Sequence, residues 1–299
     1  MDSLLFTGAS GFLGKNILPY LQNIFNVKTI GLSRNDTYNI DIAKATPTLK
    51  ESFEVVLHAA GKAHVVPKND EENRLFFDVN YQGTINLCNA LESSGIPKAF
   101  IFISTVAVYG LENGENITEY HPLNGNTPYS LSKIQAEKFL TSWCNQYNVT
   151  LGIIRPSLIA GPNPPGNLGS MIQGIKTGKY LSVAGGNARK SVLMVDDISR
   201  LILQLIEKGG VYNVCDDSQP TFRELEILIS KQLGIKTPIS IPYWLAKSMA
   251  LVGDLIGKRV PINSEKLKKI TETLTFCNEK AKRELNWEPL NVLENFKIE

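Results

Sequence analysis

A glycine-rich loop near the N-terminus constrains this chain more than any other feature. The apolar run Leu4–Thr7 predicts a strand, and the spacing of apolar residues from Gly11 to about Leu21 predicts a helix. Gly8, Gly11 and Gly14 mark the join with the spacing G-x-x-G-x-x-G. Glycines permit the tight turn, a close approach to the backbone and close helix–strand packing, while the helix N-terminus favours negative charge. The loop therefore predicts a dinucleotide pyrophosphate site.

Short apolar runs alternate with helix-like segments through the first half of the chain. The expected strands cover residues 4–7, 27–32, 55–59, 99–104 and 151–154, and the expected helices cover 11–21, 78–93 and 130–146. Strands that are apolar throughout are buried on both faces, which is typical of a parallel sheet. We predict an α/β fold with a doubly wound parallel sheet, a Rossmann domain spanning residues 1–160 and joined again by residues 191–215.

The alternation of apolar runs and helix-like segments ends after residue 156. Ile159–Asn167 holds three prolines and two glycines, which predicts a loop. Later segments look mainly helical. We expect residues 161–190 and 216–299 to form a smaller, mainly helical C-terminal lobe that binds the substrate.

Composition excludes several classes of protein. Thirty-one Lys and Arg against 29 Asp and Glu give a net charge of +2, too little for a general nucleic-acid binder. His58, His64 and His121 do not cluster with one another or with the four scattered cysteines, so we expect no metal site. There is no stretch of about 18 uninterrupted apolar residues and no signal peptide, so we expect a cytoplasmic protein without membrane insertion.

Three hydroxyl and amine side chains suggest acid–base chemistry. Tyr129 and Lys133 are four residues apart on a predicted helix and therefore share one face. A nearby ammonium group lowers the pKa of a tyrosine from about 10 and so favours its use as a general base. Thr105 follows the predicted strand 99–104, and its hydroxyl can bond to the oxygen that is oxidised or reduced. Ser104 is the alternative for that role.

The motifs resemble those of the extended short-chain dehydrogenase/reductases, the family of NAD(P)-dependent nucleotide-sugar epimerases, reductases and dehydratases. The matching segments are Thr7–Gly14, Asp41–Ile42, Leu57–Gly61, Val79–Leu87, Ser104–Gly110, Tyr129–Lys133, Arg155–Pro156 and Leu285–Pro289. They occur in the family's order and span nearly the whole chain. The resemblance implies an enzyme with Tyr129 as the acid/base, Lys133 as its partner and Thr105 as the ligand of the substrate hydroxyl.

The resemblance also implies binding residues. Those expected at the cofactor are Gly8, Ser10, Gly11, Phe12, Leu13, Gly14, Ser33, Arg34, Asp41, Ile42, His58, Ala59, Ala60, Asn80, Tyr129, Lys133 and Pro156. Those expected at a nucleotide-diphosphate sugar are Lys62, Thr105, Asn163, Arg189 and Lys190. Family members place an arginine on the diphosphate near the last pair, and either Arg189 or Lys190 supplies the charge, although only arginine gives a bidentate contact.

One departure from the family pattern narrows the reaction. Dehydratases of this branch carry an Asp–Glu pair after the threonine, where this chain has Val106–Ala107. These apolar side chains cannot transfer a proton, so dehydration is disfavoured. A 4-epimerase or a 4-keto reductase needs only Thr105, Tyr129, Lys133 and a hydride carrier. Several loops resemble the subgroup that handles N-acetylated deoxy-sugars for polysaccharide biosynthesis.

The end of the second predicted strand bears on the choice of cofactor. Ser33 and Arg34 suit the 2′-phosphate of NADP, whereas an acidic residue there would favour NAD. We therefore favour NADP over NAD, although Asp36 lies just beyond. Alternative functions are a non-catalytic dinucleotide sensor and an NADPH-dependent reductase of a non-sugar carbonyl compound. The family resemblance also makes a homodimer plausible, through helices near residues 85–95 and 130–146.

Overall fold

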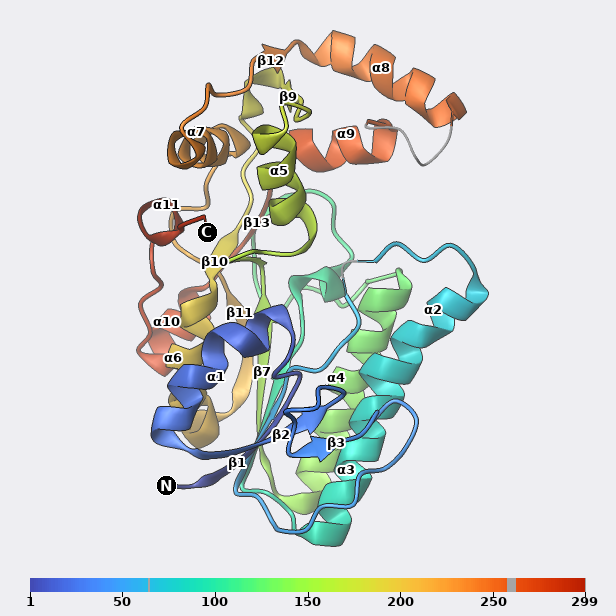
Figure 1. Cartoon of the computed structure of the whole chain (residues 1–299), viewed down its shortest axis with the longest axis vertical. Helices are drawn as coiled ribbons and strands as arrows, with labels where there is room; N and C mark the ends of the chain where they lie inside the picture. The colour runs from blue at the N-terminus through green and yellow to red at the C-terminus, as the bar shows by residue number, and fades with distance from the viewer. Residues whose placement is uncertain (64, 257–261, 299) are drawn as a thin grey trace.

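The computed structural model describes residues 1–63, 65–256 and 262–298 and is built around a seven-stranded parallel sheet (Figure 1). The strands follow the order β11-β7-β5-β4-β1-β2-β3. Their bounds are β1 Ser3–Thr7, β2 Asn26–Gly31, β3 Tyr38–Asn39, β4 Val55–His58, β5 Ala99–Ile103, β7 Thr150–Pro156 and β11 Gly210–Val214. Every adjacent pair is parallel, as the uniformly apolar runs predict.

Helices cover both faces of this sheet (Figure 1). Helices α1 (Phe12–Ile24) and α6 (Val195–Lys208) pack on one face, where side chains from β1, β4 and β7 form a common core with them. Helices α3 (Gly83–Ser94) and α4 (Pro128–Tyr147) pack on the other face with a second core. The predicted doubly wound α/β fold is confirmed.

The helical run before β5 differs from the expected single helix over residues 78–93. Helix α2 (Asp70–Phe77) leads into a π-helical turn, η1 (Asp78–Gln82), which continues as α3. The spacing of apolar residues in the sequence does not reveal the extra residue of a π turn. Such turns occur often at functional sites because they redirect a side chain, and η1 carries the buried Asn80.

The direction in which the chain winds reverses between β1 and β4. The strands after β1 add outward as β2 and β3, whereas β4, β5, β7 and β11 add on its other side. Ligands of doubly wound sheets bind outside the carboxyl ends of the strands at such a reversal. The glycine loop and the residues after His58 both lie at this point.

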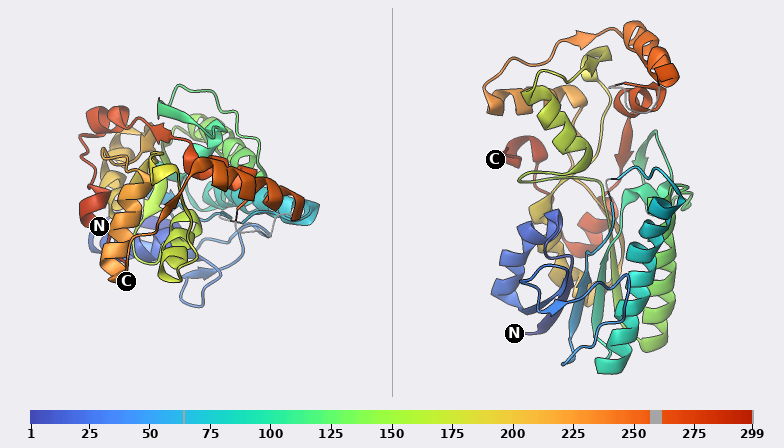
Figure 2. Two further views of the ribbon diagram at one scale, coloured as in Figure 1. Left: turned by 90° about the horizontal axis from the view of Figure 1, so that it is seen from above. Right: turned by 45° about the vertical axis from the view of Figure 1, so that its right-hand side comes forward.

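A second, mainly helical lobe stands above the carboxyl end of the sheet (Figures 1 and 2). Its helices are α5 (Gly166–Lys176), α7 (Phe222–Leu233), α8 (Tyr243–Ile256), α9 (Ser264–Thr271) and the short α11 (Val292–Asn295). Three two-stranded pairs accompany them: β8 (Leu158–Ala160) with β10 (Val192–Met194), β9 (Ser182–Val183) with β12 (Ser240–Ile241), and β6 (Gly114–Ile117) with β13 (Leu274–Phe276). Because β8 and α5 occupy both its ends, the proline-rich loop is shorter than expected.

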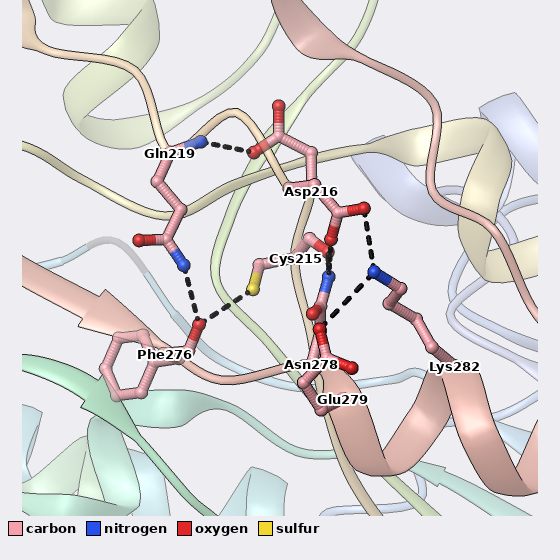
Figure 3. A network of polar contacts seen from close by, with 8 residues as sticks. Cys215, Asp216, Gln219, Phe276, Asn278, Glu279 and Lys282 are labelled. Carbon is pink, nitrogen blue, oxygen red and sulfur yellow. Dashed lines mark hydrogen bonds and ion pairs between the residues drawn. The ribbon is translucent and has the colours of Figure 1, made fainter.

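A polar network ties the end of β11 to the start of helix α10 (Glu279–Leu285) (Figure 3). The Asn278 amide donates to the Cys215 carbonyl and to Asp217, at 2.8 Å each, and Lys282 Nζ contacts Asp217 at 3.0 Å. Beyond it, Ala281 and Leu285 pack into the same core as β1 and α6. The chain therefore returns to the main core inside the segment 216–299 that we expected to form the second lobe.

Candidate active site

The glycine loop has the backbone that a pyrophosphate site needs. Gly8 has a φ of +83°, and a Cβ there would lie 2.6 Å from the Ala60 nitrogen. A Cβ at Gly14 would lie 2.3 Å from the Gly8 oxygen. Gly11, the N-cap of α1, is exposed together with Ser10, and its own Cβ would meet only the Gly8 oxygen at 3.3 Å. The loop is thus tightly packed at Gly8 and Gly14 and exposed at Ser10 and Gly11. It lies at a helix N-terminus that has no side-chain cap.

A chain of hydroxyl and imidazole groups fixes the neighbouring strand end. His58 is fully buried, with Nδ1 2.6 Å from Thr7 Oγ1 and Nε2 2.9 Å from Thr84 Oγ1. The Thr84 hydroxyl donates its one hydrogen bond to the Asn80 carbonyl, so it accepts a hydrogen bond from His58 Nε2–H. Burial lowers the pKa of His58 to about 3, and the nearby Lys133 adds to the effect. The neutral His58 ring therefore braces the site from behind and has no nitrogen left for a ligand.

The π turn aims Asn80 at the loop after β4. Its Oδ1 accepts from the Lys62 backbone nitrogen at 2.7 Å, and its Nδ2 donates to the Lys62 carbonyl and to Ser132 Oγ. Lys62 Nζ lies 5.7 Å from the centroid of the Phe76 ring, which in turn lies 6.2 Å from the ring of Tyr129. The structure thus brings Lys62 toward the predicted acid/base.

Tyr129 lies in the first turn of α4. Thr127 caps this helix in a reciprocal capping box with Ser130, and a proline follows the cap, so the start of the helix is well fixed. Burial raises the pKa of Tyr129, while a hydrogen bond with Thr105 opposes the rise. Ser104 instead donates its hydroxyl to Glu137. The geometry therefore places Thr105, and not Ser104, beside the tyrosine.

Lys133 lies one helical turn beyond Tyr129 and is 4% exposed. Its Nζ donates to the Ile103 carbonyl at 2.9 Å and lies 4.5 Å from the centroid of the Phe102 ring. Burial lowers its pKa to about 8, and the carboxylate of Glu137 opposes the shift. A Cβ at the exposed Gly61 would lie 3.2 Å from this Nζ, so the glycine leaves the ammonium group accessible from the loop after β4.

Sequence reasoning missed Glu137 and the network that it organises. Arg155 Nη2 lies 2.6 Å from Glu137 Oε2 and its Nε 3.1 Å from Oε1, with both side chains at most 6% exposed. Arg155 Nη1 also donates to the Tyr109 hydroxyl, which donates to Asn213. The signal was available in part, because Glu137 continues the four-residue spacing of Tyr129 and Lys133 along α4.

An acidic residue, Asp36, and a basic residue, Arg34, both lie just after β2. Asp36 Oδ2 accepts from the Ser33 backbone nitrogen at 2.9 Å, and a Cβ on Gly31 would lie 2.5 Å from the same oxygen. Arg34 is exposed, and no ion pair within the described chain engages it. Arg34 is therefore available to an anionic group, while the carboxylate of Asp36 is already held by the backbone.

The other predicted binding residues are more dispersed. Phe12 and Leu13 pack on the core of α1, Ile42 is buried beside Gly83, and Pro156 ends β7. Asp41 Oδ1 accepts from the Ala43 nitrogen. Ala59 and Ala60 lie against Gly8.

The predicted diphosphate ligands lie in the upper lobe. Asn163 is exposed with a φ of +50°. Arg189 Nη1 donates to the Gln219 carbonyl, whereas Lys190 is half-buried, and burial lowers its pKa to about 8. Among the contacts of the described residues, none joins Asn163, Arg189 or Lys190 to Tyr129, so their roles stay predictions.

The residues present fit a nicotinamide dinucleotide better than a metal ion. The described residues contain no group of three or more His, Cys, Asp or Glu side chains that could hold a metal; His64 lies outside them. None of the helices described is long and apolar enough to cross a bilayer. The open glycine loop, the exposed Arg34 and the buried ammonium of Lys133 line the carboxyl end of the sheet, where a dinucleotide would lie.

Comparisons with known proteins agree with this fit. Residues 4–215 match the model of the NAD dependent epimerase/dehydratase family. The chain is 32% identical over 295 residues to the N-acetyl-α-D-glucosaminyl-diphospho-ditrans,octacis-undecaprenol 4-epimerase of Escherichia coli O157:H7, covering 92% of this chain and 87% of that one. It is 29% identical to the UDP-glucose 4-epimerase of Vibrio cholerae, covering 99% and 93%. Both relatives are named as enzymes.

A solved structure has the same fold. The structure of RMD from Pseudomonas aeruginosa complexed with NADPH superposes with a TM-score of 0.74 at 22% identity, covering 98% of this chain and 96% of that one. Because the family model matches well over half of the sequence, the family is established. The chain is an enzyme of the NAD dependent epimerase/dehydratase family, the extended short-chain dehydrogenase/reductases.

Proposed function

We propose that the protein is a 4-epimerase of a sugar carried on a diphosphate, with Thr105, Tyr129 and Lys133 as its catalytic residues. The observation that carries the proposal is the arrangement of three residues: Thr105 follows the carboxyl end of β5 and adjoins Tyr129, whose pKa it lowers, and Lys133 lies one turn along the same helix as Tyr129. A hydroxyl pair backed by an ammonium group is what removal of a proton from an alcohol requires.

The side chains divide the work by their surroundings. Tyr129 takes the proton of the C4 hydroxyl, and Thr105 holds the same oxygen in place. Burial raises the pKa of Tyr129, and the neighbouring Thr105 hydroxyl opposes that rise. The ammonium group of Lys133, one helical turn away, is proposed to favour the phenolate during the reaction. A bound nicotinamide supplies the chemistry that these residues lack, which is to accept hydride and return it. Tyr129 then returns the proton once the sugar has presented its other face.

Val106 and Ala107 support the absence of a dehydration step. They open the 3₁₀ turn η2 (Val106–Tyr109), which Thr105 caps by accepting from the Ala107 nitrogen at 3.1 Å. Neither side chain can donate or accept a proton, so the structure offers no acid–base pair directly after the threonine.

The diphosphate can be carried by a nucleoside or by a polyprenol, the two carriers in the names of the relatives above. We propose Lys190 or Arg189 as its cationic ligand in either case. Lys190 is the more enclosed of the two, and a neighbouring anion would restore the charge that burial disfavours. Lys62, held by Asn80, is proposed to contact the sugar.

One observation favours a second candidate, a 4-keto sugar reductase that consumes NADPH. Arg34 is exposed at the tip of β2 without an ion-pair partner in the described chain, where it can bind a 2′-phosphate. On this ground we propose NADP rather than NAD as the preferred cofactor. A reductase would use the same three residues, with Tyr129 donating the proton to the C4 oxygen.

The experiment that separates these candidates is identification of the dinucleotide that the purified protein releases on denaturation. An epimerase recycles its cofactor, so near-stoichiometric release supports the first candidate. An empty site that NADPH stabilises against heat more than NADH does supports the reductase. In both cases Tyr129→Phe should abolish turnover and leave dinucleotide binding within about twofold, because the hydroxyl is a small part of that contact. If the wild type binds dinucleotide but turns over no sugar or other carbonyl compound, the protein is a sensor.

A further inference from the structure

Helix α8 buries its small side chains and exposes its large apolar ones, the reverse of the usual pattern for a surface helix. The side chains that it turns toward the lobe are small: Ala246 and Ala250 are fully buried, and Gly253 lies with them on the same face. The large apolar side chains point away. Their exposed fractions are 68% for Trp244, 37% for Leu245, 39% for Met249, 55% for Leu251, 55% for Val252 and 89% for Leu255.

The exposed apolar side chains form a broad face. At 3.6 residues per turn they span roughly 160° of the helix circumference, opposite the small residues. Ser248 is the one polar residue inside this arc, and Lys247 and Asp254 lie at or beyond its edge. Scattered exposed apolar residues need no explanation, but a contiguous face of this kind marks an interaction site.

The helix is held firmly in this orientation. Asp254 Oδ1 accepts from the Ser264 backbone nitrogen at 3.0 Å, and its other oxygen accepts from the Ser264 hydroxyl, which ties the end of α8 to the start of α9. Ala246 and Ala250 pack with Leu267 of α9 and with Val183. Figures 1 and 2 show α8 at the outer end of the upper lobe, with none of the other described helices or strands on its far side.

We infer that α8 lies in the surface of a lipid bilayer, with the face of Trp244, Val252 and Leu255 among the acyl chains, and that the substrate is the polyprenyl-linked form. A wide apolar arc, with Lys247 and Asp254 along one edge and with Tyr243 and Trp244 at one end of the helix, is typical of an interfacial helix. A coiled-coil contact between two copies through α8 would use a narrower seam of apolar residues than this arc. At 14 residues the helix lies along a bilayer and does not span one.

The choice of carrier rests on the proposed function, since it concerns the substrate of that same site. A sugar diphosphate on a polyprenol has its lipid in the membrane and its sugar at the surface. In a molecule docked through α8, the carboxyl end of the sheet faces the bilayer, with the upper lobe between the two (Figure 1). The bilayer contact itself involves no residue of the catalytic set.

Vesicle flotation tests the contact directly. The wild type should float with vesicles of phosphatidylcholine mixed with phosphatidylglycerol, and Leu255→Glu should reduce the bound fraction about tenfold or more, because it places a charge among acyl chains. The matched control is Ile227→Glu on α7, where the side chain is 48% exposed in the same lobe; it should bind like the wild type. Absence of wild-type binding, or equal binding by Leu255→Glu, would overturn the inference.

Tryptophan fluorescence gives a second readout. Trp143 and Trp287 are 5% and 4% exposed, so Trp244 is the tryptophan that solvent reaches. Adding vesicles should shift the emission to the blue in the wild type, and Trp244→Phe should bind vesicles without the shift. If Leu255→Glu instead halves the mass of the protein in lipid-free buffer, α8 joins two copies and the inference fails.

Turnover separates this inference from the proposed function. Leu255→Glu should retain the wild-type rate on a nucleotide-diphosphate sugar and lose about tenfold or more on a polyprenyl diphosphate sugar in vesicles, because it no longer docks. Equal rates for both proteins on the vesicle substrate would overturn the choice of carrier. If the wild type floats with vesicles but turns over neither sugar substrate, that result would count against the proposed function and not against the bilayer contact.

Discussion

Replacing Glu137 with glutamine should destabilise the fold well beyond the loss of one surface charge. Glutamine keeps the shape but removes the charge that Arg155 faces, and its amide nitrogen meets the Arg155 donors. Arg155 then retains only the Tyr109 hydroxyl and one amide oxygen as acceptors, at 6% exposure. Removing one partner of a buried pair costs about 3–5 kcal/mol. Because the amide oxygen still accepts one bond, we expect a loss near the lower limit, about 3 kcal/mol.

Urea unfolding followed by circular dichroism measures this loss through the shift in midpoint. Glu265→Gln is the matched control, because it breaks an exposed pair with Lys269 on α9 and should cost about 0.5 kcal/mol or less. The double variant Glu137→Gln/Arg155→Met should be less destabilised than the sum of its single variants, since it removes the stranded charge. A loss below about 1 kcal/mol for Glu137→Gln would refute this account of the network.

The same substitution has a consequence for catalysis. The carboxylate of Glu137 raises the pKa of Lys133, which burial holds at about 8. Without that charge the lysine loses its proton at lower pH, so the alkaline limb of the activity profile should move toward neutral pH. A pH–rate profile of the stable fraction checks this direction, and an unmoved alkaline limb would show that Lys133 does not set it.

Three further predictions concern the dinucleotide site. Gly14→Ala should weaken dinucleotide binding more than about tenfold by calorimetry, because its Cβ would meet backbone atoms at 2.3 and 2.5 Å. Arg34→Ala should raise the Kd of NADP about tenfold and leave that of NAD within twofold; equal effects would refute the 2′-phosphate contact. Stability should fall as pH drops from 6.5 toward 3, since unfolded His58 binds a proton that the folded ring refuses, and His58→Gln should flatten this slope in urea titrations.

The fold was predictable because its signals are local. Uniformly apolar runs at Leu4–Thr7 and Ala99–Ser104 could only be strands buried on both faces, and the alternation with helices left few topologies. The glycine loop was predictable for the same reason, since each glycine answers a local steric demand. The π turn was not, because an insertion of one residue hardly changes apolar spacing over two helical turns.

The site was predictable only where chemistry and spacing coincide along the chain. The four-residue interval between Tyr129 and Lys133 places both side chains on one face of a helix. The ion pair between Glu137 and Arg155 joins a helix to a strand, and only the packed sheet brings the two together. Burial makes His58 a brace although its motif suggested a ligand contact. The outward face of α8 also escaped prediction, because an apolar run alone does not tell which side of a helix meets the core.

The central claim is that hydride leaves and returns at C4 beside Tyr129. It is tested most directly with N-acetylglucosamine deuterated at C4 and offered on uridine diphosphate and on polyprenyl diphosphate. The account predicts a C4-inverted product that retains deuterium at that carbon, and no product with Tyr129→Phe. Inversion with loss of deuterium to solvent, or undiminished turnover by Tyr129→Phe, would contradict it.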